Sequence, residues 1–244
     1  DMITFAVGAL SDYPCEFFDI NMGCPVTKIV NNQSGCYLMK DIKLASQIID
    51  ETVKNTKLKV SVKFRSGWDK QHINAVEFAK MCENHGASHI TVHGRTRSEF
   101  YSGKADWNII HQVKQAVKIP VIGNGDITSP YIAQERIQQT GADGIMIARG
   151  ILGAPWMIAQ THNFLEKGIL PVQPSIQEIK QTLLQHIQNL INYYGENMAL
   201  QISRKYVCWY CKNMRDAKRF REAYMHITEY KKAYDTINQY FDSC

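Results

Sequence analysis

The 244-residue sequence has no apolar run that approaches the roughly 20 residues a membrane-spanning helix needs. It also lacks an amino-terminal basic region followed by an apolar one, which a secretory signal requires. These absences argue against a membrane-spanning segment. Because the sequence begins with Asp1 and not with Met, we expect an upstream segment.

The seven cysteines lack the regular spacing of a disulfide framework, and their number is odd. A chain of this length has no need of disulfide bonds, so a reducing, cytoplasmic compartment fits best. Cys208 and Cys211 have the C-x-x-C spacing of a zinc site, but no second pair follows and both lie in a helical pattern. We therefore predict no metal site.

What the sequence does have is a regular alternation of short apolar runs rich in Val and Ile with amphipathic stretches. This alternation is typical of a parallel sheet covered by helices. The expected strands are 17–21, 60–64, 89–93, 120–124 and 144–147. The expected helices between them are 41–55, 72–85, 107–117 and 129–140.

A polar or glycine-rich cluster follows every expected strand, which is the arrangement of a (β/α)8 barrel. A doubly wound sheet would gather such residues at its switch point instead. If the clusters at 123–126 and 148–150 form the phosphate site that barrels place after strands seven and eight, the visible strands are four to eight. The sequence thus predicts an α/β TIM barrel that lacks its first three strands, with residues 2–13 as the remainder of the third helix.

The sequence becomes all-helical after Gly150, with expected helices at 155–166, 176–193, 197–214 and 227–241 and a turn-rich linker at 167–175. We expect a barrel domain over residues 1–168 and a helical domain over 169–244. Segment 196–232 has nine Lys or Arg side chains and four acidic ones, a surplus that equals the net charge of +5 of the whole chain. This charge favours an RNA partner, and a solvated helix face is the alternative.

The strand ends also predict a cofactor. Gly123–Ile127 and Ala148–Gly150 can place backbone N–H groups and a guanidinium around a phosphate, although each could also be a simple tight turn. Lys63 and His93 occupy equivalent places at the ends of neighbouring strands. Two such groups opposite a phosphate cradle suggest a flavin mononucleotide (FMN) whose ring they polarise.

Five segments, in this order, resemble the tRNA-dihydrouridine synthase family over most of residues 16–157. They are "DINMGCPVTKIVNNQSGCYLMKD", "VSVKFRSGWD", "TVHGRTRSEFYSGKADW", "IPVIGNGDI" and "GADGIMIARGILGAPW". The tail segment "ISRKYVCWYCKNM" is similar, more loosely, to the carboxy-terminal RNA-binding domain of that family, and most to its bacterial branch.

The resemblance implies that NADPH or NADH reduces bound FMN, which passes hydride to carbon 6 of a uracil in tRNA. Cys24 would protonate carbon 5, and an ordinary thiol suits this role because it is mostly protonated at neutral pH. Asn21 would contact the flavin or the uracil, and Lys63 and His93 the flavin ring. The phosphate end would be held by Asn124, Gly125, Asp126, Ala148 and Arg149.

A uracil within tRNA must leave its stack to meet a flavin, so we expect Arg95, Arg97 and Tyr101 to hold the extruded nucleotide. In the helical tail, four basic residues fall close to helical spacing and could form one RNA-binding stripe. They are Arg204, Lys205, Lys212 and Arg215. We expect a monomer whose partner is tRNA.

The sequence departs from the family pattern in having no counterpart of the first strand or of the third-strand glutamine that contacts the flavin. We therefore expect residues 1–244 alone to bind FMN poorly and to fold marginally. Two other functions stay open: an FMN-dependent oxidoreductase of a small molecule, and a non-catalytic RNA-binding protein. No dinucleotide fingerprint distinguishes NADPH from NADH.

Overall fold

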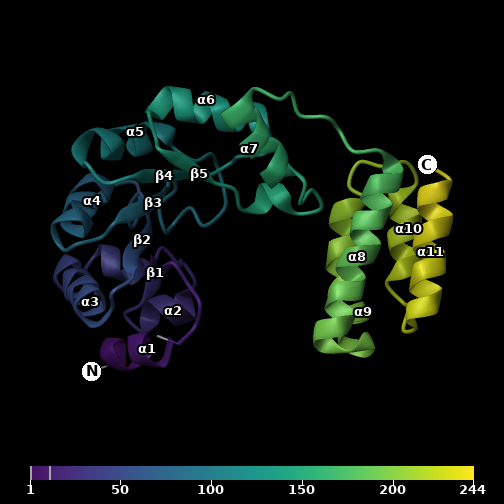
Figure 1. The fold of residues 1–244 in the computed structure, drawn as a ribbon, viewed down its shortest axis with the longest axis horizontal. Helices are drawn as coiled ribbons and strands as arrows, with labels where there is room; N and C mark the ends of the chain where they lie inside the picture. Colours follow the sequence, from purple (N-terminus) through teal and green to yellow (C-terminus); the bar gives the residue numbers. More distant parts are fainter. Residues whose placement is uncertain (1, 11) are drawn as a thin grey trace. The chain divides into compact units, whose positions relative to one another are not determined.

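The computed structural model describes residues 2–10 and 12–244 (Figure 1). Asp1 and Ser11, the second of which falls within the predicted opening helix, lie outside the described residues. Contacts within the chain divide it into two units, Asp1–Ala148 and Arg149–Cys244. This division lies earlier than the expected boundary at residues 168 and 169, which stays a prediction.

The first unit is built on a five-stranded parallel sheet whose spatial order follows the sequence. Its strands are β1 (Phe17–Met22), β2 (Lys59–Arg65), β3 (His89–His93), β4 (Val121–Asn124) and β5 (Gly144–Met146). Sequential order without reversal is that of a barrel and not of a doubly wound sheet. β4 begins one residue later than expected because Pro120 has no backbone N–H to donate.

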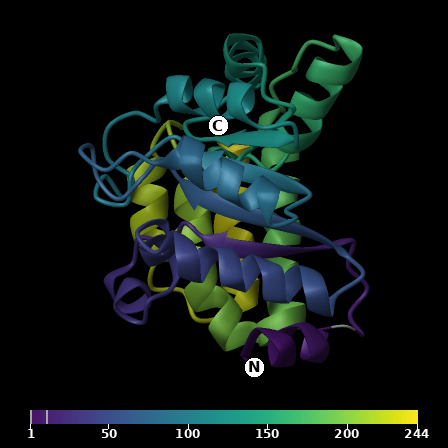
Figure 2. The same ribbon diagram turned by 90° about the vertical axis from the view of Figure 1, so that its left-hand side faces the viewer.

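Helices α3 to α6 lie along one side of this sheet, as Figures 1 and 2 show. The helices of the unit are α1 (Met2–Leu10), α2 (Thr27–Asn31), α3 (Ile42–Asn55), α4 (Ala75–Asn84), α5 (Trp107–Ala116) and α6 (Pro130–Thr140), with a 3₁₀ helix, η1 (Gly35–Met39). α6 has the expected start, since the Ser129 side chain accepts from Ile132 N and Pro130 follows it. α2 and η1 were not predicted, because five residues are too few to show helical periodicity.

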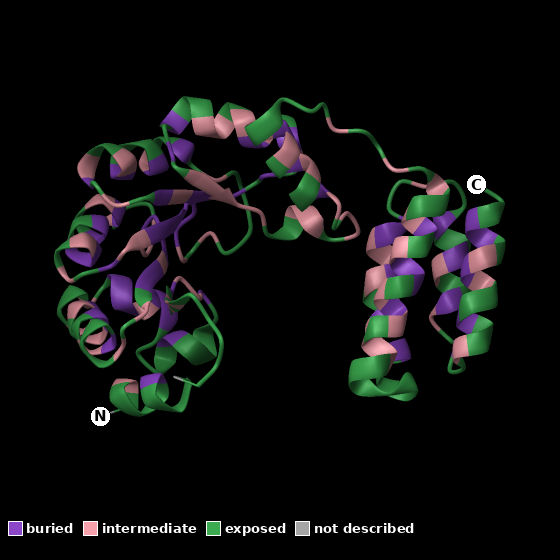
Figure 3. Ribbon diagram, in the orientation of Figure 1, coloured by how far each residue is buried: buried purple, intermediate pink, exposed green. Residues whose placement is uncertain are grey.

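The core of the first unit lies between the sheet and these helices. Phe64 of β2 packs against Phe78 of α4, with ring centroids 5.0 Å apart, and both side chains are fully buried. Figure 3 shows the buried residues concentrated on the strands and on the sheet-facing sides of the helices. Successive side chains of a strand point to opposite faces of the sheet, so the residues on either side of Phe64 in β2 face away from the helices.

The second unit contains helices and no strand among its described residues, and with the parallel sheet it confirms the predicted fold class. It comprises η2 (Arg149–Ile151), α7 (Met157–Lys167), α8 (Ile176–Tyr194), α9 (Glu196–Tyr210), α10 (Ala217–Tyr224) and α11 (Tyr230–Asp242). Helices α8 to α11 enclose an apolar core in which Phe220 stacks on Tyr240 at 4.0 Å. Residues 168–175 form an irregular linker.

The expected helix 197–214 is wrong at its end. α9 stops at Tyr210, and Asn213 and Asp216 adopt left-handed backbone conformations before α10 begins. Asn and Asp tolerate that conformation better than other non-glycine residues, which is why the chain can turn here. Lys212 and Arg215 therefore lie in a turn and not on one helical stripe with Arg204 and Lys205.

Candidate active site

The register of the sheet brings the predicted flavin-contacting residues onto one face. Asn21 lies opposite Lys63, and Arg65 lies opposite His93, which in turn lies opposite Asn124. Partners in parallel register direct their side chains to the same face. Since Phe64 points toward the helices, Lys63, Arg65 and His93 face the other side of the sheet.

This face carries concentrated positive charge. Burial, followed by the charges of Arg65 and Lys63, lowers the pKa of His93 from its ordinary 6.5 to about 3, so its imidazole is neutral at pH 7. Burial also lowers the pKa of Lys63, and Arg65 lowers it further, whereas Asp19 raises it. The surface is thus suited to an electron-rich or anionic ligand.

Cys24 lies in the turn that follows β1, half-buried. Gly23 N donates to Asn21 Oδ1 at 3.0 Å, and Cys36 N donates to Cys24 O at 3.0 Å. Gly35 packs so closely that a Cβ on it would lie 2.8 Å from the Cys24 carbonyl oxygen. The cysteine turn is therefore held on two sides by backbone contacts.

Cys36 is fully buried behind this turn. Burial raises the pKa of its thiol to about 11, so it stays protonated and unreactive at neutral pH. Cys24 is therefore the thiol of this pair that a substrate could reach.

Arg65 is a residue of this site to which the sequence assigned no role. Its Nε donates to Gly23 O at 3.0 Å, and its Nη1 donates to Thr96 O at 2.9 Å and to Phe100 O at 2.8 Å. The side chain is 3% exposed. Arg65 thus joins the cysteine turn to the loop that carries Arg97 and Tyr101. The sequence signal was its position two residues after Lys63, which puts both side chains on one face of β2.

Arg95, predicted to bind RNA, and Asp126, predicted to bind phosphate, form an ion pair with each other. Arg95 Nη2 lies 2.9 Å from each carboxylate oxygen of Asp126, and Arg95 also donates to the carbonyls of Ser102 and Gly103. The Arg95 side chain is only 2% exposed. The pair braces the loop between β3 and α5, and the predicted ligand contacts of both residues stay predictions.

Asn124 and Gly125 lie at the end of β4, as expected. Asn124 Nδ2 donates to Met146 O at 2.8 Å, which ties β4 to β5. Gly125 has φ +136°, and a Cβ there would collide with the Ala105 side chain and come 3.3 Å from the His93 ring. Only glycine fits this turn. Ala148 and Arg149 end the first unit and begin the second, and their phosphate contacts stay predictions.

Trp68 forms the centre of a basic and aromatic cluster that the sequence did not reveal. Lys40 Nζ lies 4.5 Å from its ring centroid and Arg97 Cζ lies 4.7 Å from it. Arg97 also lies 5.6 Å from the Phe100 ring, and Tyr101 is 57% exposed. Positive charge beside accessible aromatic faces is suited to an unstacked nucleotide.

The basic residues of the tail have different surroundings. Lys205 is exposed on α9, with its Nζ 5.5 Å from the Tyr206 ring and 5.1 Å from the Trp209 ring. Arg204 is half-buried, and its Nε has no hydrogen-bond partner among the described residues. Lys212 and Arg215 are exposed in the turn after α9.

The comparison with protein families is decisive, because the family profile described as "Dihydrouridine synthase (Dus)" matches residues 1–244. The chain belongs to the dihydrouridine synthase family. Among curated relatives, a "Probable tRNA-dihydrouridine synthase" of Rickettsia conorii is 43% identical over 93% of this chain and 69% of its own length. A "tRNA-dihydrouridine synthase B" of Pasteurella multocida is 39% identical over 95% of this chain and 70% of its own length.

Membership of the dihydrouridine synthase family confirms the resemblance drawn from the five segments. Within the described residues, no helix is both long and apolar enough to cross a membrane. Residues 2–10 and 12–244 also contain no group of three or more His, Cys, Asp or Glu side chains placed to hold a metal ion.

Proposed function

We propose that this protein reduces specific uridines of tRNA to 5,6-dihydrouridine, with Cys24 as the proton donor. The observation that carries the proposal is the position of Cys24 in a braced turn at the end of β1, beside the strand ends of Lys63 and His93. Membership of the dihydrouridine synthase family supports it.

The residues on the face of the sheet that points away from the helices fit a flavin. Lys63, Arg65 and the neutral His93 can donate hydrogen bonds to the carbonyl oxygens of an isoalloxazine ring, and their surplus positive charge favours its reduced, anionic form. The flavin, reduced by NADPH or NADH, would supply hydride. Asn21 and Lys63 would orient the ring and the base, and Asn124, Gly125, Asp126, Ala148 and Arg149 would hold the phosphate end.

Hydride addition at carbon 6 of uracil leaves negative charge that a proton at carbon 5 must neutralise. In the proposed reaction Cys24 Sγ–H gives up that proton, and the braced turn keeps the thiol in place. Arg97 and Tyr101 would hold the extruded nucleotide, and the basic tail would bind the body of the tRNA. The protein would act as a monomer in the cytoplasm.

The test is dihydrouridine formation by the intact, flavin-loaded protein on unmodified tRNA with NADPH, measured by mass spectrometry of the nucleosides. Cys24→Ala should slow formation at least about 100-fold, because general acid catalysis contributes that much. Cys15→Ala is the matched control, since Cys15 is exposed and lies before β1.

Reduction at the wild-type rate by Cys24→Ala would reject the role of the thiol. Reduction of free uracil compounds but not of tRNA would favour a small-molecule oxidoreductase. Tight tRNA binding without flavin or reduction would favour a non-catalytic RNA-binding protein.

A further inference from the structure

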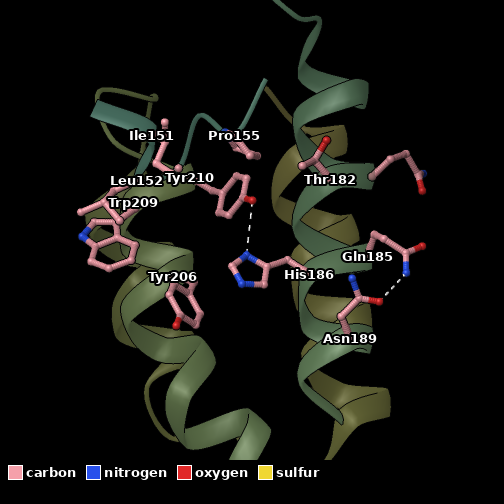
Figure 4. A pocket seen from close by; sticks show the side chains of 12 residues that line it. Ile151, Leu152, Pro155, Thr182, Gln185, His186, Asn189, Tyr206, Trp209 and Tyr210 are labelled. Carbon is pink, nitrogen blue, oxygen red and sulfur yellow. Dashed lines mark hydrogen bonds between the residues drawn. The ribbon is translucent and has the colours of Figure 1, made fainter. Parts of the chain in front are cut away.

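The second unit contains a cavity of about 680 Å³ that the proposed reaction does not use. Its walls are one side of α8, the carboxy-terminal half of α9 and the loop from Ile151 to Pro155. Gly153, at φ +77°, lets this loop lie directly on the backbone of Trp209, where a side chain would collide. Figure 4 shows His186 and Tyr206 directed into the space between the two helices.

Aromatic rings line much of the cavity without being closed off from solvent. The rings of His186 and Tyr206 lie 4.4 Å apart, and those of Tyr206 and Trp209 lie 5.2 Å apart. All three side chains are only partly buried. Because each of these rings keeps part of its surface exposed, a planar ligand can still stack against them.

Polar side chains that can form hydrogen bonds with the edge of a base lie beside these rings. Gln185 Nε2 donates to Asn189 Oδ1 at 2.9 Å, which uses one donor and one acceptor of two amides that each offer more. Tyr210 Oη lies 3.4 Å from His186 Nδ1. Burial lowers the pKa of His186, so its neutral ring can both donate and accept a hydrogen bond.

Positive charge lies at the same rings. Lys205 Nζ is within 5.5 Å of the centroids of Tyr206 and Trp209. Lys205 belongs to the segment 196–232, whose surplus of basic residues equals the net charge of the chain. A planar ligand joined to a phosphate would therefore meet stacking faces, hydrogen-bonding amides and a cation together.

We propose that this cavity binds one unstacked nucleobase of the tRNA substrate, away from the uridine that is reduced. Trp209 and Tyr206 would stack on the base, Gln185 and Asn189 would bond its edge, and Lys205 would contact the adjoining phosphate. Aromatic stacking joined to a basic track is the usual means of binding single-stranded RNA. The inference rests on the proposed function, which brings tRNA to the protein.

The test compares Kd values for unmodified tRNA, measured with the intact protein at several salt concentrations. Trp209→Leu keeps apolar volume but removes the stacking face, and it should weaken binding about tenfold. The slope of log K against log salt should not change, because no phosphate contact is lost. Trp209→Phe should restore most of the affinity, and Lys205→Ala should instead lower the slope by about 1.

Tyr193→Leu is the control, since Tyr193 is 81% exposed on α8 and does not line the cavity. The double variant Gln185→Ala, Asn189→Ala changes only exposed side chains, so its effect does not depend on folding. Wild-type affinity of both this variant and Trp209→Leu would overturn the proposal. Wild-type protein that binds tRNA but forms no dihydrouridine would reject the proposed function and leave the cavity assignment standing.

Discussion

At the scale of single residues, the position of Cys24 depends on a side chain from another strand. Arg65 comes from β2 and holds the carbonyl before Cys24 together with two carbonyls of the loop after β3. A buried guanidinium must have its donors satisfied, so each of these bonds restrains the turn. The candidate proton donor and the candidate nucleotide-binding loop are consequently coupled through Arg65.

His93 predicts a specific loss of stability in acid. Its pKa is about 3 in the folded protein and 6.5 when unfolded, so below pH 6.5 the unfolded state binds one more proton and the folded state loses stability. Between pH 6.5 and pH 5 this amounts to about 2 kcal/mol. In urea unfolding at pH 7.5 and pH 5, His93→Gln should lose about 2 kcal/mol less than wild type. Equal losses would contradict the buried, neutral state of His93.

At the scale of elements, a side-chain hydrogen bond caps the start of α3, α5, α6 and α8. α8 starts with a capping box, in which Glu178 N donates to Ser175 Oγ at 3.3 Å and Ser175 N donates to Glu178 Oε2 at 2.7 Å. The two bonds satisfy donors that the first turn of a helix otherwise leaves unpaired. This cap fixes the start of the helix that forms one wall of the nucleobase cavity.

Ser175→Ala should lower the free energy of unfolding of the helical unit by about 1 kcal/mol, because it removes one side of the capping box. Ser175→Asp should change it little, since Asp also accepts from the first turn. Urea unfolding followed by the circular dichroism of the helices measures both. Equal stability of the Ala and Asp variants would show that the cap contributes nothing.

At the scale of the whole molecule, an exposed linker joins α7 to α8. Residues 168–175 have no regular structure, and Ile169, Leu170 and Val172 are 54%, 66% and 76% exposed. Exposed, irregular segments are preferred sites of proteolysis. β1 is the edge strand of the described sheet, because it pairs with β2 alone, and Asn21 on it is exposed.

Limited digestion with thermolysin, which cleaves before large apolar residues, should cut first within residues 168–172. Mass spectrometry should then find fragments that end and begin there. A matched variant, Leu170→Gly with Val172→Gly, should be cut more slowly. A first cut near Leu152 would instead support the earlier division at Arg149 and contradict the boundary predicted at residues 168 and 169.

Much of the fold could be predicted because its signals are local. Short apolar runs mark the five strands, and Ser129-Pro130 marks the start of α6. The turn between α9 and α10 was missed because the helical pattern continues through residues 211–214, while Asn213 and Asp216 turn the chain. Trp68 was missed because its partners, Lys40 and Arg97, are distant in sequence.

The sequence by itself determined the order of the strands and of most helices, the segments that resemble dihydrouridine synthases, and Cys24 as the candidate thiol. Each of these is carried by neighbouring residues, whose periodicity and turn chemistry act locally. Only the tertiary structure decided that Arg65 braces the cysteine turn, that Arg95 pairs with Asp126, and that α8 and α9 enclose a cavity. These features join residues far apart in the chain, and the packing of whole strands and helices brings them together.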